Sequence, residues 1–367
     1  MKKKKRILIC PLDWGLGHAT RCIPIIQYLI EQGLEVIIAA DKRPLALLKK
    51  EFPTLSFVIM PGYEIKYPAK GSMNVKMFFS IPKIFLGIYC EHVLLKKIIE
   101  EKQIDLVISD NRYGLWTKKA PCIFISHQIM IKMPRGFSFG FETLLYKIIR
   151  YFIKKYDECW IPDEEGIENL SGDLSHRYPL LANTFFIGAL SRFNISNATE
   201  QYNNETKEIK YEYDLMVTLS GPEPQRSIFE EKVLCQLKEF ALKTLIVRGT
   251  PENKEDIKIN ENIEIVSHMK AKEMQEAMWS SKVILARSGY STIMDLACLG
   301  KRAILVPTPG QTEQEYLANY HHKKKAIFAI EQEEFDLNKA FIEAEKYPGF
   351  EKISGSNGFK MRLENLL

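Results

Sequence analysis

The chain has 367 residues, a length that allows two domains of ordinary size. Its 46% hydrophobic and 26% charged residues are typical of a globular protein and exclude a disordered or fibrous chain. The net charge of +5 is unevenly spread, because residues 1–190 carry 27 Lys and Arg against 19 Asp and Glu. A basic first half can face an anionic acceptor or an anionic membrane surface. We expect no nucleic-acid partner, because the chain has no recognisable nucleic-acid-binding motif.

Seven cysteines are scattered along the chain without C-x-x-C spacing. This pattern favours reduced thiols in a cytoplasmic protein and argues against a zinc site or a disulfide framework. The basic start, MKKKKR, is followed by too short an apolar stretch for a signal peptide. No apolar run reaches the ~20 residues of a membrane-spanning helix. The richest stretch, Met77–Leu95, contains a proline and charged residues and is either buried core or an apolar lip that contacts a membrane.

Taken in order, short apolar runs alternate with segments of helical periodicity. In the first half we expect strands at 6–12, 34–41, 55–60, 104–110, 120–128, 157–163 and 183–188. Helices are expected between them at 18–31, 43–52, 75–102 with a break near Pro82, and 138–155. In the second half we expect strands at 214–221, 243–249, 261–267, 282–286, 303–307 and 326–330. Helices are expected there at 225–240, 271–281, 292–300, 313–324, 336–345 and 352–367.

This alternation predicts an α/β fold with two Rossmann-like, doubly wound parallel sheets facing each other across a cleft. The first domain is expected at 1–190 and the second at 212–350. A polar, Asn-rich stretch at 191–211 is typical of a linker. The last segment, 351–367, is predicted to be a C-terminal helix that can pack back on the first domain.

The stretch 286–314 is a strand, a glycine turn, a helix and a second strand. Small and hydroxyl-bearing residues occupy the start of its helix: Ser288, Gly289, Ser291 and Thr292. Free backbone N–H groups and the positive end of the helix dipole make such a start an anion site. Asp295, one turn further on, carries a carboxylate that can bind two sugar hydroxyls. A nucleotide diphosphate-sugar pocket and an ordinary helix cap both fit this unit alone.

Ligands of open α/β sheets bind at the carboxyl ends of the strands. In the first half these ends carry His, Asp and amide groups, in Asp13–His18, Asp110–Arg112 and Ser126–Gln128. In the second half they carry Gly, hydroxyl and Arg groups, in Ser220-Gly221, Arg248-Gly249, His268-Met269, Arg287–Gly289 and Thr308–Gln311. The first set suits proton transfer and sugar recognition, and the second suits a diphosphate.

Three motifs resemble the GT-B nucleotide-sugar glycosyltransferases of the MurG-like, family 28 type. The loop GLGH at 15–18 is similar to that family's Gly-rich loop ending in GGH. The run RSGYSTIMDLACLGKRAILVP resembles its RSGA-x-T-x-x-E core and the following VP strand, and QTEQEY resembles its donor loop. The resemblance covers nearly the whole chain. Asp295 departs from the pattern, because the family has the longer Glu at that position.

The resemblance implies roles for residues in both halves. The donor-binding residues would be Ser220, Gly221, Arg248, Met269, Arg287, Ser288, Gly289, Ser291, Thr292, Asp295, Gln311 and Gln314. Among them, the serine–glycine pairs would bind the diphosphate, Met269 the uracil, Asp295 the ribose and the two glutamines the donor sugar. Gly15, Gly17, His127 and Gln128 would lie on the acceptor side. His18 would be the general base, with Asp110 as its orienting acid.

These roles predict transfer of a hexose or N-acetylhexosamine from a UDP-sugar to a hydroxyl acceptor, with inversion. A neutral histidine has a pKa suited to removing a proton from a hydroxyl, and a carboxylate partner fixes its tautomer. The acceptor is expected to be a cell-envelope or lipid-linked glycan, which suits a cytoplasmic enzyme bound peripherally to the inner face of the membrane. We expect no cofactor and no essential metal, because the chain has no D-x-D motif.

Three other functions fit parts of the sequence. UDP-sugar hydrolases of nonulosonic-acid synthesis share this fold and a G-x-G-H-x-x-R-C loop, which this chain matches from Gly15 to Cys22. Against a hydrolase stand the extra segments 63–102 and 138–155, which are typical of acceptor recognition. A non-catalytic binder is disfavoured by the presence of both His18 and Asp110. A UDP-GlcNAc 2-epimerase would need more acidic residues in the first domain.

Overall fold

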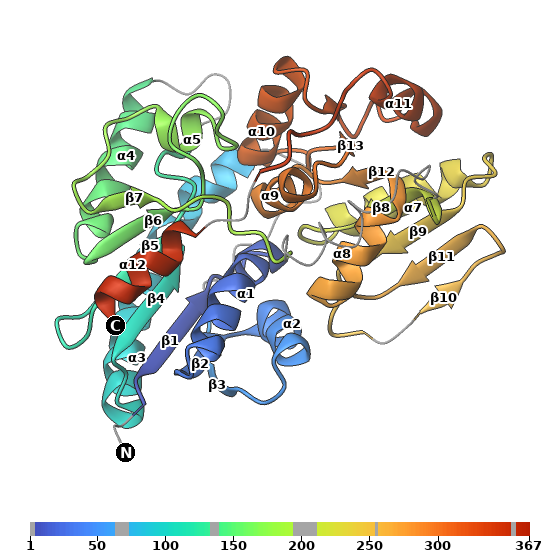
Figure 1. Cartoon of the computed structure of the whole chain (residues 1–367). Helices are drawn as coiled ribbons and strands as arrows, with labels where there is room; N and C mark the ends of the chain where they lie inside the picture. Colours follow the sequence, from blue (N-terminus) through green and yellow to red (C-terminus); the bar gives the residue numbers. More distant parts are fainter. Residues whose placement is uncertain (1–3, 63–72, 133–138, 194–210, 254–255, 354–356) are drawn as a thin grey trace. The chain divides into compact units, whose positions relative to one another are not determined.

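The structure of the chain is a computed structural model that describes residues 4–62, 73–132, 139–193, 211–253, 256–353 and 357–367. It divides into two compact units (Figure 1). Unit 1 comprises Met1–Leu190 with Ser356–Leu367, and unit 2 comprises Ser191–Gly355. Each unit has one sheet of seven strands with helices packed around it, which confirms the predicted α/β fold with two Rossmann-like sheets. Most of the expected linker, from 194 to 210, lies outside the described residues.

The sheet of unit 1 is parallel throughout and has the order β3-β2-β1-β4-β5-β6-β7. Its strands are β1 Arg6–Pro11, β2 Glu35–Ala40, β3 Ser56–Ile59, β4 Leu106–Asp110, β5 Cys122–Ile125, β6 Glu158–Ile161 and β7 Thr184–Phe186. These runs are short and almost continuously apolar, as strands covered on both faces must be. Pro11 pairs with Asp110, and Asp110 with Ile125, so β1, β4 and β5 end side by side.

The helices of unit 1 are α1 Leu16–Glu31, α2 Lys42–Glu51, α3 Met73–Lys102, α4 Phe139–Ile153, α5 Asp173–His176 and α12 Gly358–Leu366. The expected break in the third helix is wrong, because α3 runs continuously through Pro82. Pro82 lies in the third turn of this helix, where its missing N–H removes one backbone hydrogen bond without ending the helix. Further along α3, the side chains of Ile88, Glu91 and Leu95 are buried.

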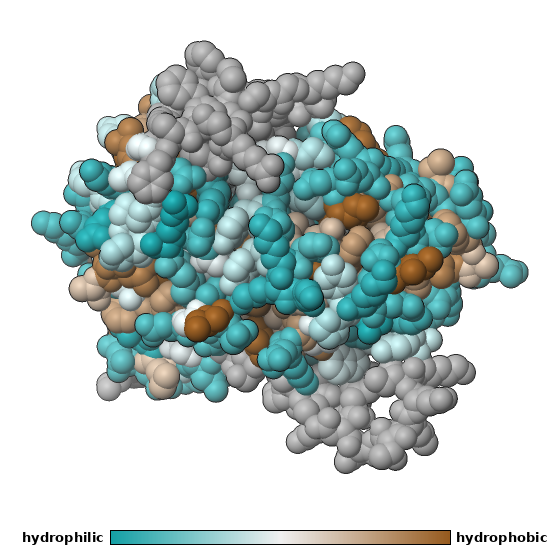
Figure 2. Space-filling view, turned by 90° about the horizontal axis from the view of Figure 1, so that it is seen from above, coloured by the Kyte–Doolittle hydropathy of each residue, from teal (hydrophilic) through white to brown (hydrophobic). Residues whose placement is uncertain are grey.

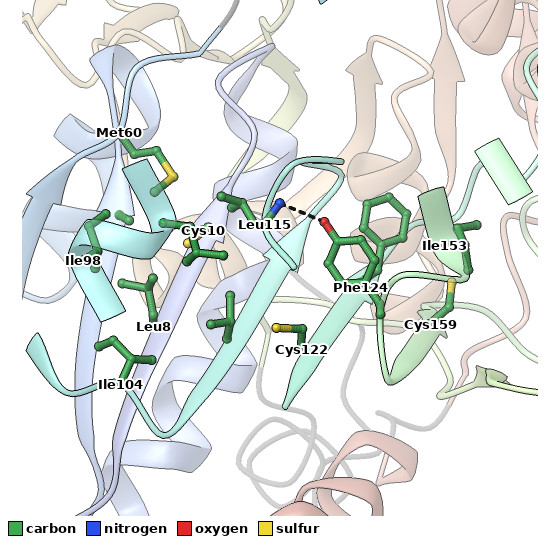
Figure 3. Packing of buried hydrophobic residues seen from close by; sticks show 14 of the residues in the cluster. Leu8, Cys10, Met60, Ile98, Ile104, Leu115, Cys122, Phe124, Ile153 and Cys159 are labelled. Carbon is green, nitrogen blue, oxygen red and sulfur yellow. Dashed lines mark hydrogen bonds between the residues drawn. The ribbon is translucent and has the colours of Figure 1, made fainter. Parts of the chain in front are cut away.

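The core of unit 1 lies between its sheet and helices α3 and α4 (Figure 3). Leu8, Cys10 and Phe124 extend from strands into this core and are fully buried. Tyr156 is also buried, and its hydroxyl accepts a hydrogen bond from the backbone N–H of Leu115 at 3.1 Å. The hydroxyl therefore has a partner inside the apolar cluster, as a buried polar group requires.

The sheet of unit 2 has the order β10-β11-β9-β8-β12-β13-β14. Its strands are β8 Tyr213–Thr218, β9 Thr244–Val247, β10 Ile257–Lys258, β11 Ile263–Val266, β12 Ser281–Ala286, β13 Ala303–Leu305 and β14 Phe328–Ala329. All neighbours are parallel except β10, a two-residue edge strand that pairs antiparallel with β11 and that the sequence did not predict. Thr218 pairs with both Val247 and Ala286, so the central strands end together.

The helices of unit 2 are α7 Gln225–Leu237, α8 Ala271–Trp279, α9 Tyr290–Leu299, α10 Thr312–Lys323 and α11 Leu337–Ala344. Helix α9 begins after Gly289 and ends at Gly300, whose φ of 62° is a left-handed conformation that glycine adopts without strain. This is the helix that the stretch 286–314 predicts.

The C-terminal helix α12 belongs to unit 1. Arg362 donates to Glu158 through Nε at 2.7 Å and lies 3.3 Å from the centre of the Phe185 ring. Tyr28 on α1 donates to Glu364 at 3.0 Å. The last residues of the chain are thus bound to the first helix and to the strands β6 and β7.

No helix in the described part of the chain combines the length and the apolarity needed to cross a membrane. On the face shown in Figure 2, hydrophobic residues are scattered among a majority of hydrophilic ones. The exposed apolar residues of unit 1 include four on α3, which are Phe85, Leu86, Tyr89 and Val93. The side chains of 77–81, the first part of the Met77–Leu95 stretch, lie outside the described residues.

Candidate active site

The first helix of unit 1 begins at the loop predicted for the acceptor side. Gly15 precedes α1 with φ 142° and ψ 173°, a conformation open to glycine and strained for other residues. Gly17 and His18 follow in the first turn of the helix. The turn leads directly from the end of β1, so His18 lies near the carboxyl ends of the neighbouring strands.

His18 and Asp110 are in direct contact. The imidazole Nδ1 lies 2.7 Å from Oδ1 of Asp110, the last residue of β4. The Asp110 side chain is fully buried, whereas 17% of the His18 side chain remains exposed. A buried carboxylate bonded to one ring nitrogen leaves the other ring nitrogen available to a substrate.

The electrostatics of this pair favour a neutral histidine and an ionised carboxyl group. Burial, and after it the charge of Arg21, lower the pKa of His18 below its ordinary value, against the opposing effect of Asp110. Burial alone would raise the pKa of Asp110, but the positive Arg21 and the bond to His18 outweigh it and hold this pKa below its usual range. A neutral imidazole beside a carboxylate is the protonation state that a general base needs.

Arg21 is the residue of this site that the sequence did not assign. It lies one turn after His18 on α1, and it is 2% exposed. Its guanidinium donates to both oxygens of Asp110 and lies 2.9 Å from Nδ1 of His127. The i, i+3 spacing from His18 was the available signal, because residues three apart share a helix face.

His127 and Gln128 follow β5, at the same edge of the sheet. His127 is 5% exposed and is bound to Arg21. The backbone N–H of Gln128 donates to Oγ of Ser126 at 3.1 Å, and that hydroxyl also lies 3.3 Å from Oδ1 of Asn111. The structure therefore brings three residues predicted from different strand ends, His18, Asp110 and His127, into one cluster.

In unit 2, the strand ends predicted to bind the donor also meet at one edge. Gly221, after β8, has φ 100°, and a Cβ placed there would lie 3.5 Å from Oγ1 of Thr308, after β13. The Thr308 hydroxyl is buried and has no hydrogen-bond partner among the described residues. Gly289 lies at the start of α9, where a Cβ would meet nothing within 4 Å. The edge thus has room for a ligand at Gly289.

Helix α9 begins after Gly289, an N-cap residue that has no side chain to cap the helix. Ser291 and Thr292 lie in its first turn and are half-buried. Such a helix start attracts a negative charge through its N–H groups and its dipole.

Several predicted donor-binding side chains instead hold unit 2 together. Arg287 is 1% exposed and donates to the backbone oxygens of Val306, Pro307 and Gln225. Burial lowers its pKa to about 9, which still leaves it cationic at neutral pH. The Ser288 hydroxyl donates to the backbone oxygen of Gln314 at 2.8 Å. The side chains of Arg287 and Ser288 therefore form hydrogen bonds within unit 2. The predicted direct contact of Arg287 with a ligand does not fit its position.

The two predicted glutamines shape the loop after β13. Gln314 accepts from the backbone N–H of Thr308 at 2.8 Å and donates to Oε1 of Gln311. Gln311 is half-buried at the start of α10. Of this pair, the less buried Gln311 has the side chain better placed to contact a ligand.

Arg248 and Met269 are half-buried residues after β9 and β11. Arg248 donates to Glu230 at 2.6 Å, and the same carboxylate accepts from Arg226 at 2.9 Å. Arg226 also donates to Glu223 at 2.6 Å, so two arginines and two glutamates balance in charge at this corner of the edge.

Asp295 departs from the predicted geometry. It is 3% exposed, and its two oxygens accept from Oγ of Ser191 at 2.7 Å and from Nε of Arg192 at 3.0 Å. Burial raises the pKa of this carboxyl group even though Arg192 and Ser191 act to lower it. The carboxylate therefore binds Ser191 and Arg192, the first residues of unit 2, and is not exposed for a ribose to bind.

Among the described residues, no group of three or more His, Cys, Asp or Glu side chains is arranged to hold a metal ion. The expectation of a metal-independent reaction stays a prediction. Arginine side chains and helix starts can stabilise a leaving diphosphate without a metal ion.

Residues 224–347 match the glycosyltransferase family 28 C-terminal domain. The chain is 23% identical over 356 residues to the UDP-N-acetylglucosamine--N-acetylmuramyl-(pentapeptide) pyrophosphoryl-undecaprenol N-acetylglucosamine transferase of Histophilus somni, covering 92% of this chain and 88% of that one. The fold of this chain is similar to that of Acinetobacter baumannii MurG, with a TM-score of 0.51, 12% identity and 99% of both chains covered. It is also similar to the Streptomyces glycosyltransferase SsfS6 complexed with thymidine diphosphate, with a TM-score of 0.54, 12% identity, and 92% of this chain and 89% of that one covered.

The fold is of the GT-B type, and the matches make the chain similar to glycosyltransferases with that fold. Within that class the chain is MurG-like, and its second unit contains a family 28 C-terminal domain.

Proposed function

We propose that this glycosyltransferase moves a hexose or an N-acetylhexosamine from a UDP-sugar to a hydroxyl group of a cell-envelope or lipid-linked glycan, with inversion at the anomeric carbon. The observation that carries the proposal is the contact of 2.7 Å between His18 Nδ1 and Asp110 Oδ1. This pair has the geometry and the protonation state of a base for a hydroxyl group.

In this mechanism, Nε2 of His18 removes the proton of the acceptor hydroxyl as its oxygen attacks the anomeric carbon. The bond from that carbon to the UDP oxygen breaks, and the electron pair leaves with UDP. Asp110 stabilises the imidazolium that forms, because its carboxylate is ionised and 2.7 Å away. One displacement from the face opposite UDP inverts the anomeric configuration.

The donor is assigned to unit 2. The diphosphate would lie on the start of α9 at Gly289 and on the loop at Ser220 and Gly221, with the Arg248 side chain nearby. The uracil would pack on Met269, and Gln311 would contact the sugar. A ribose role for Asp295 requires the ribose to share the carboxylate with Arg192 or to displace it. The helix start at Gly289 and the glycines at this edge support a diphosphate ligand.

We propose a lipid-linked acceptor partly because of helix α3. Its residues Phe85, Leu86, Tyr89 and Val93 are between 45% and 66% exposed. Exposed apolar side chains among lysines suit a peripheral contact with an anionic membrane, here on the cytoplasmic side.

The membrane contact is tested by flotation of the double variant Phe85→Ser/Leu86→Ser with anionic vesicles. The control is Ile167→Ser, which removes an 84% exposed apolar residue elsewhere in unit 1. The double variant should lose flotation and the control should keep it; unchanged flotation of the double variant rejects this membrane contact.

A UDP-sugar hydrolase is the second candidate, and one observation favours it. Arg21 and Cys22 of the hydrolase-like loop both lie at Asp110, with Cys22 Sγ 3.9 Å from the carboxylate. His18 would then activate water in place of an acceptor hydroxyl.

One experiment distinguishes the two candidates. The protein is incubated with a panel of UDP-sugars, with and without a lipid extract of cells, and released UDP is measured. UDP release that depends on the extract, with sugar recovered in the lipid fraction, supports the transferase. Full release without the extract supports the hydrolase. No UDP release from any sugar under either condition rejects both.

A further inference from the structure

Arg21 is a fully buried cation that contacts three other polar side chains. Its guanidinium binds both oxygens of Asp110 through Nε and Nη2. Nη1 lies 2.9 Å from Nδ1 of His127, and Nη2 lies 2.9 Å from Nδ1 of His18. One planar group therefore lies against two histidines and the carboxylate between them.

The contact with His127 fixes where that ring carries its proton. A guanidinium has only donors, so Nδ1 of His127 must accept the hydrogen bond from Nη1 of Arg21. A neutral imidazole that accepts at Nδ1 has its proton on Nε2. His127 can therefore act only as a donor at Nε2.

His18 has the opposite tautomer, because its Nδ1 faces the carboxylate of Asp110. Its Nδ1 lies 2.7 Å from an ionised carboxylate oxygen, and two lone pairs facing each other at that distance would repel. Nδ1 must therefore carry the proton and donate it to Asp110. Nη2 of Arg21 donates to the same oxygen, so its distance of 2.9 Å to Nδ1 arises from two donors sharing one acceptor. Nε2 of His18 is left with a lone pair.

We propose that Arg21 is a positioning residue for two histidines in opposite tautomers: it fixes His127 directly, and it holds the Asp110 carboxylate that fixes His18. Nε2 of His18 is then a proton acceptor, and Nε2 of His127 is a hydrogen-bond donor. For the reaction, this inference rests on the proposed function, in which His18 removes a proton from a hydroxyl group or from water. The donor role of His127 suits an oxygen atom of a sugar or of the nucleophile.

Arg21 also acts on the charge of His18. The ionisable groups that face this imidazole are Arg21 on its own helix, Asp110 at the end of β4 and His127 after β5. A proton added to His18 would place a second cation 2.9 Å from the guanidinium. Replacing Arg21 by an uncharged residue removes this repulsion, so the pKa of His18 should rise.

A purely structural arginine would connect α1 to β4 without setting either tautomer. NMR separates the two possibilities in the unmodified protein. With histidine labelled by ¹⁵N in the ring, correlation spectra show which nitrogen of each ring is protonated, and His18→Asn and His127→Asn assign the two rings. We expect His18 protonated on Nδ1 and His127 protonated on Nε2. A proton on Nε2 of His18, or on Nδ1 of His127, overturns the inference.

Variants then test the effect on turnover. Arg21→Met should lower kcat about 10–100-fold, as loss of an orienting partner does in other sites. Its KM for the UDP-sugar should stay the same, and the acidic limb of its pH–rate profile should shift to higher pH. Arg21→Lys keeps the charge but loses the forked geometry, so the limb should stay in place while kcat falls. An acidic limb that does not move in Arg21→Met contradicts the positioning role.

The matched control is Arg6→Met, which removes a paired arginine of unit 1 that binds Glu35 and lies on β1. It should leave the pH profile unchanged. If Arg21→Met does not fold, the tautomers of the unmodified protein decide the question. Tautomers as expected without any UDP-sugar turnover would reject the proposed function and leave the positioning of the histidines intact. Turnover with His127 protonated on Nδ1 and His18 protonated on Nδ1 would reject the positioning and leave the proposed function intact.

Discussion

His18 donates from Nδ1 to Oδ1 of Asp110 across 2.7 Å, which connects the first turn of α1 to the last residue of β4. The two residues are 92 positions apart in the chain. They meet because β1 and β4 are parallel neighbours whose carboxyl ends are level, with Pro11 paired to Asp110. The catalytic proposal depends on this contact.

The pH dependence of turnover should reflect the shifted pKa of His18. Burial and the neighbouring Arg21 lower this pKa, so His18 stays neutral to a pH below its ordinary value of about 6.5. Activity should therefore be retained as the pH falls through about 6.5 and be lost only at lower pH, where the imidazole is protonated. The check is kcat/KM measured against pH. An acidic limb above pH 6.5 contradicts the assignment.

Asp110→Asn should lower kcat by on the order of 10²–10⁴-fold, the size of a general-base contribution, because the amide no longer fixes the tautomer of His18. Its UDP affinity should not change, since Asp110 lies in unit 1 and the donor is assigned to unit 2. Steady-state kinetics and calorimetric titration with UDP measure the two effects. A variant with full kcat would show that the carboxylate does not support the base.

Gly289→Ala tests whether the diphosphate binds at the start of α9, and it should leave the fold unchanged. The glycine has φ −69°, and a Cβ there would meet nothing within 4 Å, so the methyl group is tolerated in the ligand-free protein. If a phosphate approaches the start of α9 closely, the methyl group should weaken UDP binding about tenfold or more, with an unchanged melting temperature. UDP titration and thermal unfolding measure the two quantities. An unchanged UDP affinity would move the diphosphate away from Gly289.

Asp295 and Arg192 should be coupled in stability. Asp295→Ala leaves the largely buried Arg192 without its carboxylate and should destabilise unit 2 by about 3–5 kcal/mol. Arg192→Met should also destabilise it, and the double variant should cost less than the two single effects added together, by about 1 kcal/mol or more. Urea unfolding of the four proteins gives the coupling free energy. Additive effects would mean that the contact contributes little. UDP affinity measured on Arg192→Met tests the ribose role, because a freed carboxylate should bind UDP more tightly.

The stability that α12 gains from the contact of Arg362 with Glu158 should depend on pH. Burial alone would raise the pKa of Glu158, but its bonds to Arg362 and Trp160 outweigh burial and lower this pKa. The stabilisation is then present above the unfolded value of about 4.3 and is lost as the pH falls through the lower folded pKa. Arg362→Ala should cost about 1.5–3 kcal/mol at neutral pH and less near pH 3. Denaturant unfolding at both pH values is the measurement, with the exposed Met361→Ala as control. A cost that does not change with pH contradicts the ion pair.

The order of strands and helices could be predicted from the sequence because buried parallel strands are short apolar runs and their helices are periodic. The same reasoning placed His18 and Asp110 together, since residues that follow parallel strands meet at one sheet edge. Two details were decided by packing instead. Helix α3 continues through Pro82, and the edge strand β10 forms from two residues that pair with β11.

The roles of the buried arginines could not be predicted in the same way. Arg287 follows a strand end like a ligand-binding residue, but it points to the carbonyl groups of Val306 and Pro307, whose positions depend on the folded loop. Arg21 lies among apolar residues of α1, and its partners come from β4 and from the residues after β5. Spacing along the chain shows which face a residue shares, and the acceptors on the neighbouring strands decide what it binds.

The central claim is that His18 is the base of a reaction that releases UDP from a UDP-sugar. The most direct test compares the unmodified protein with His18→Gln, measuring UDP release in the presence of the lipid extract and UDP affinity on the same samples. We expect His18→Gln to lose turnover by on the order of 10²–10⁴-fold while it binds UDP as the unmodified protein does. Turnover within about threefold of the unmodified protein, with equal UDP affinity, would show that His18 is not the base.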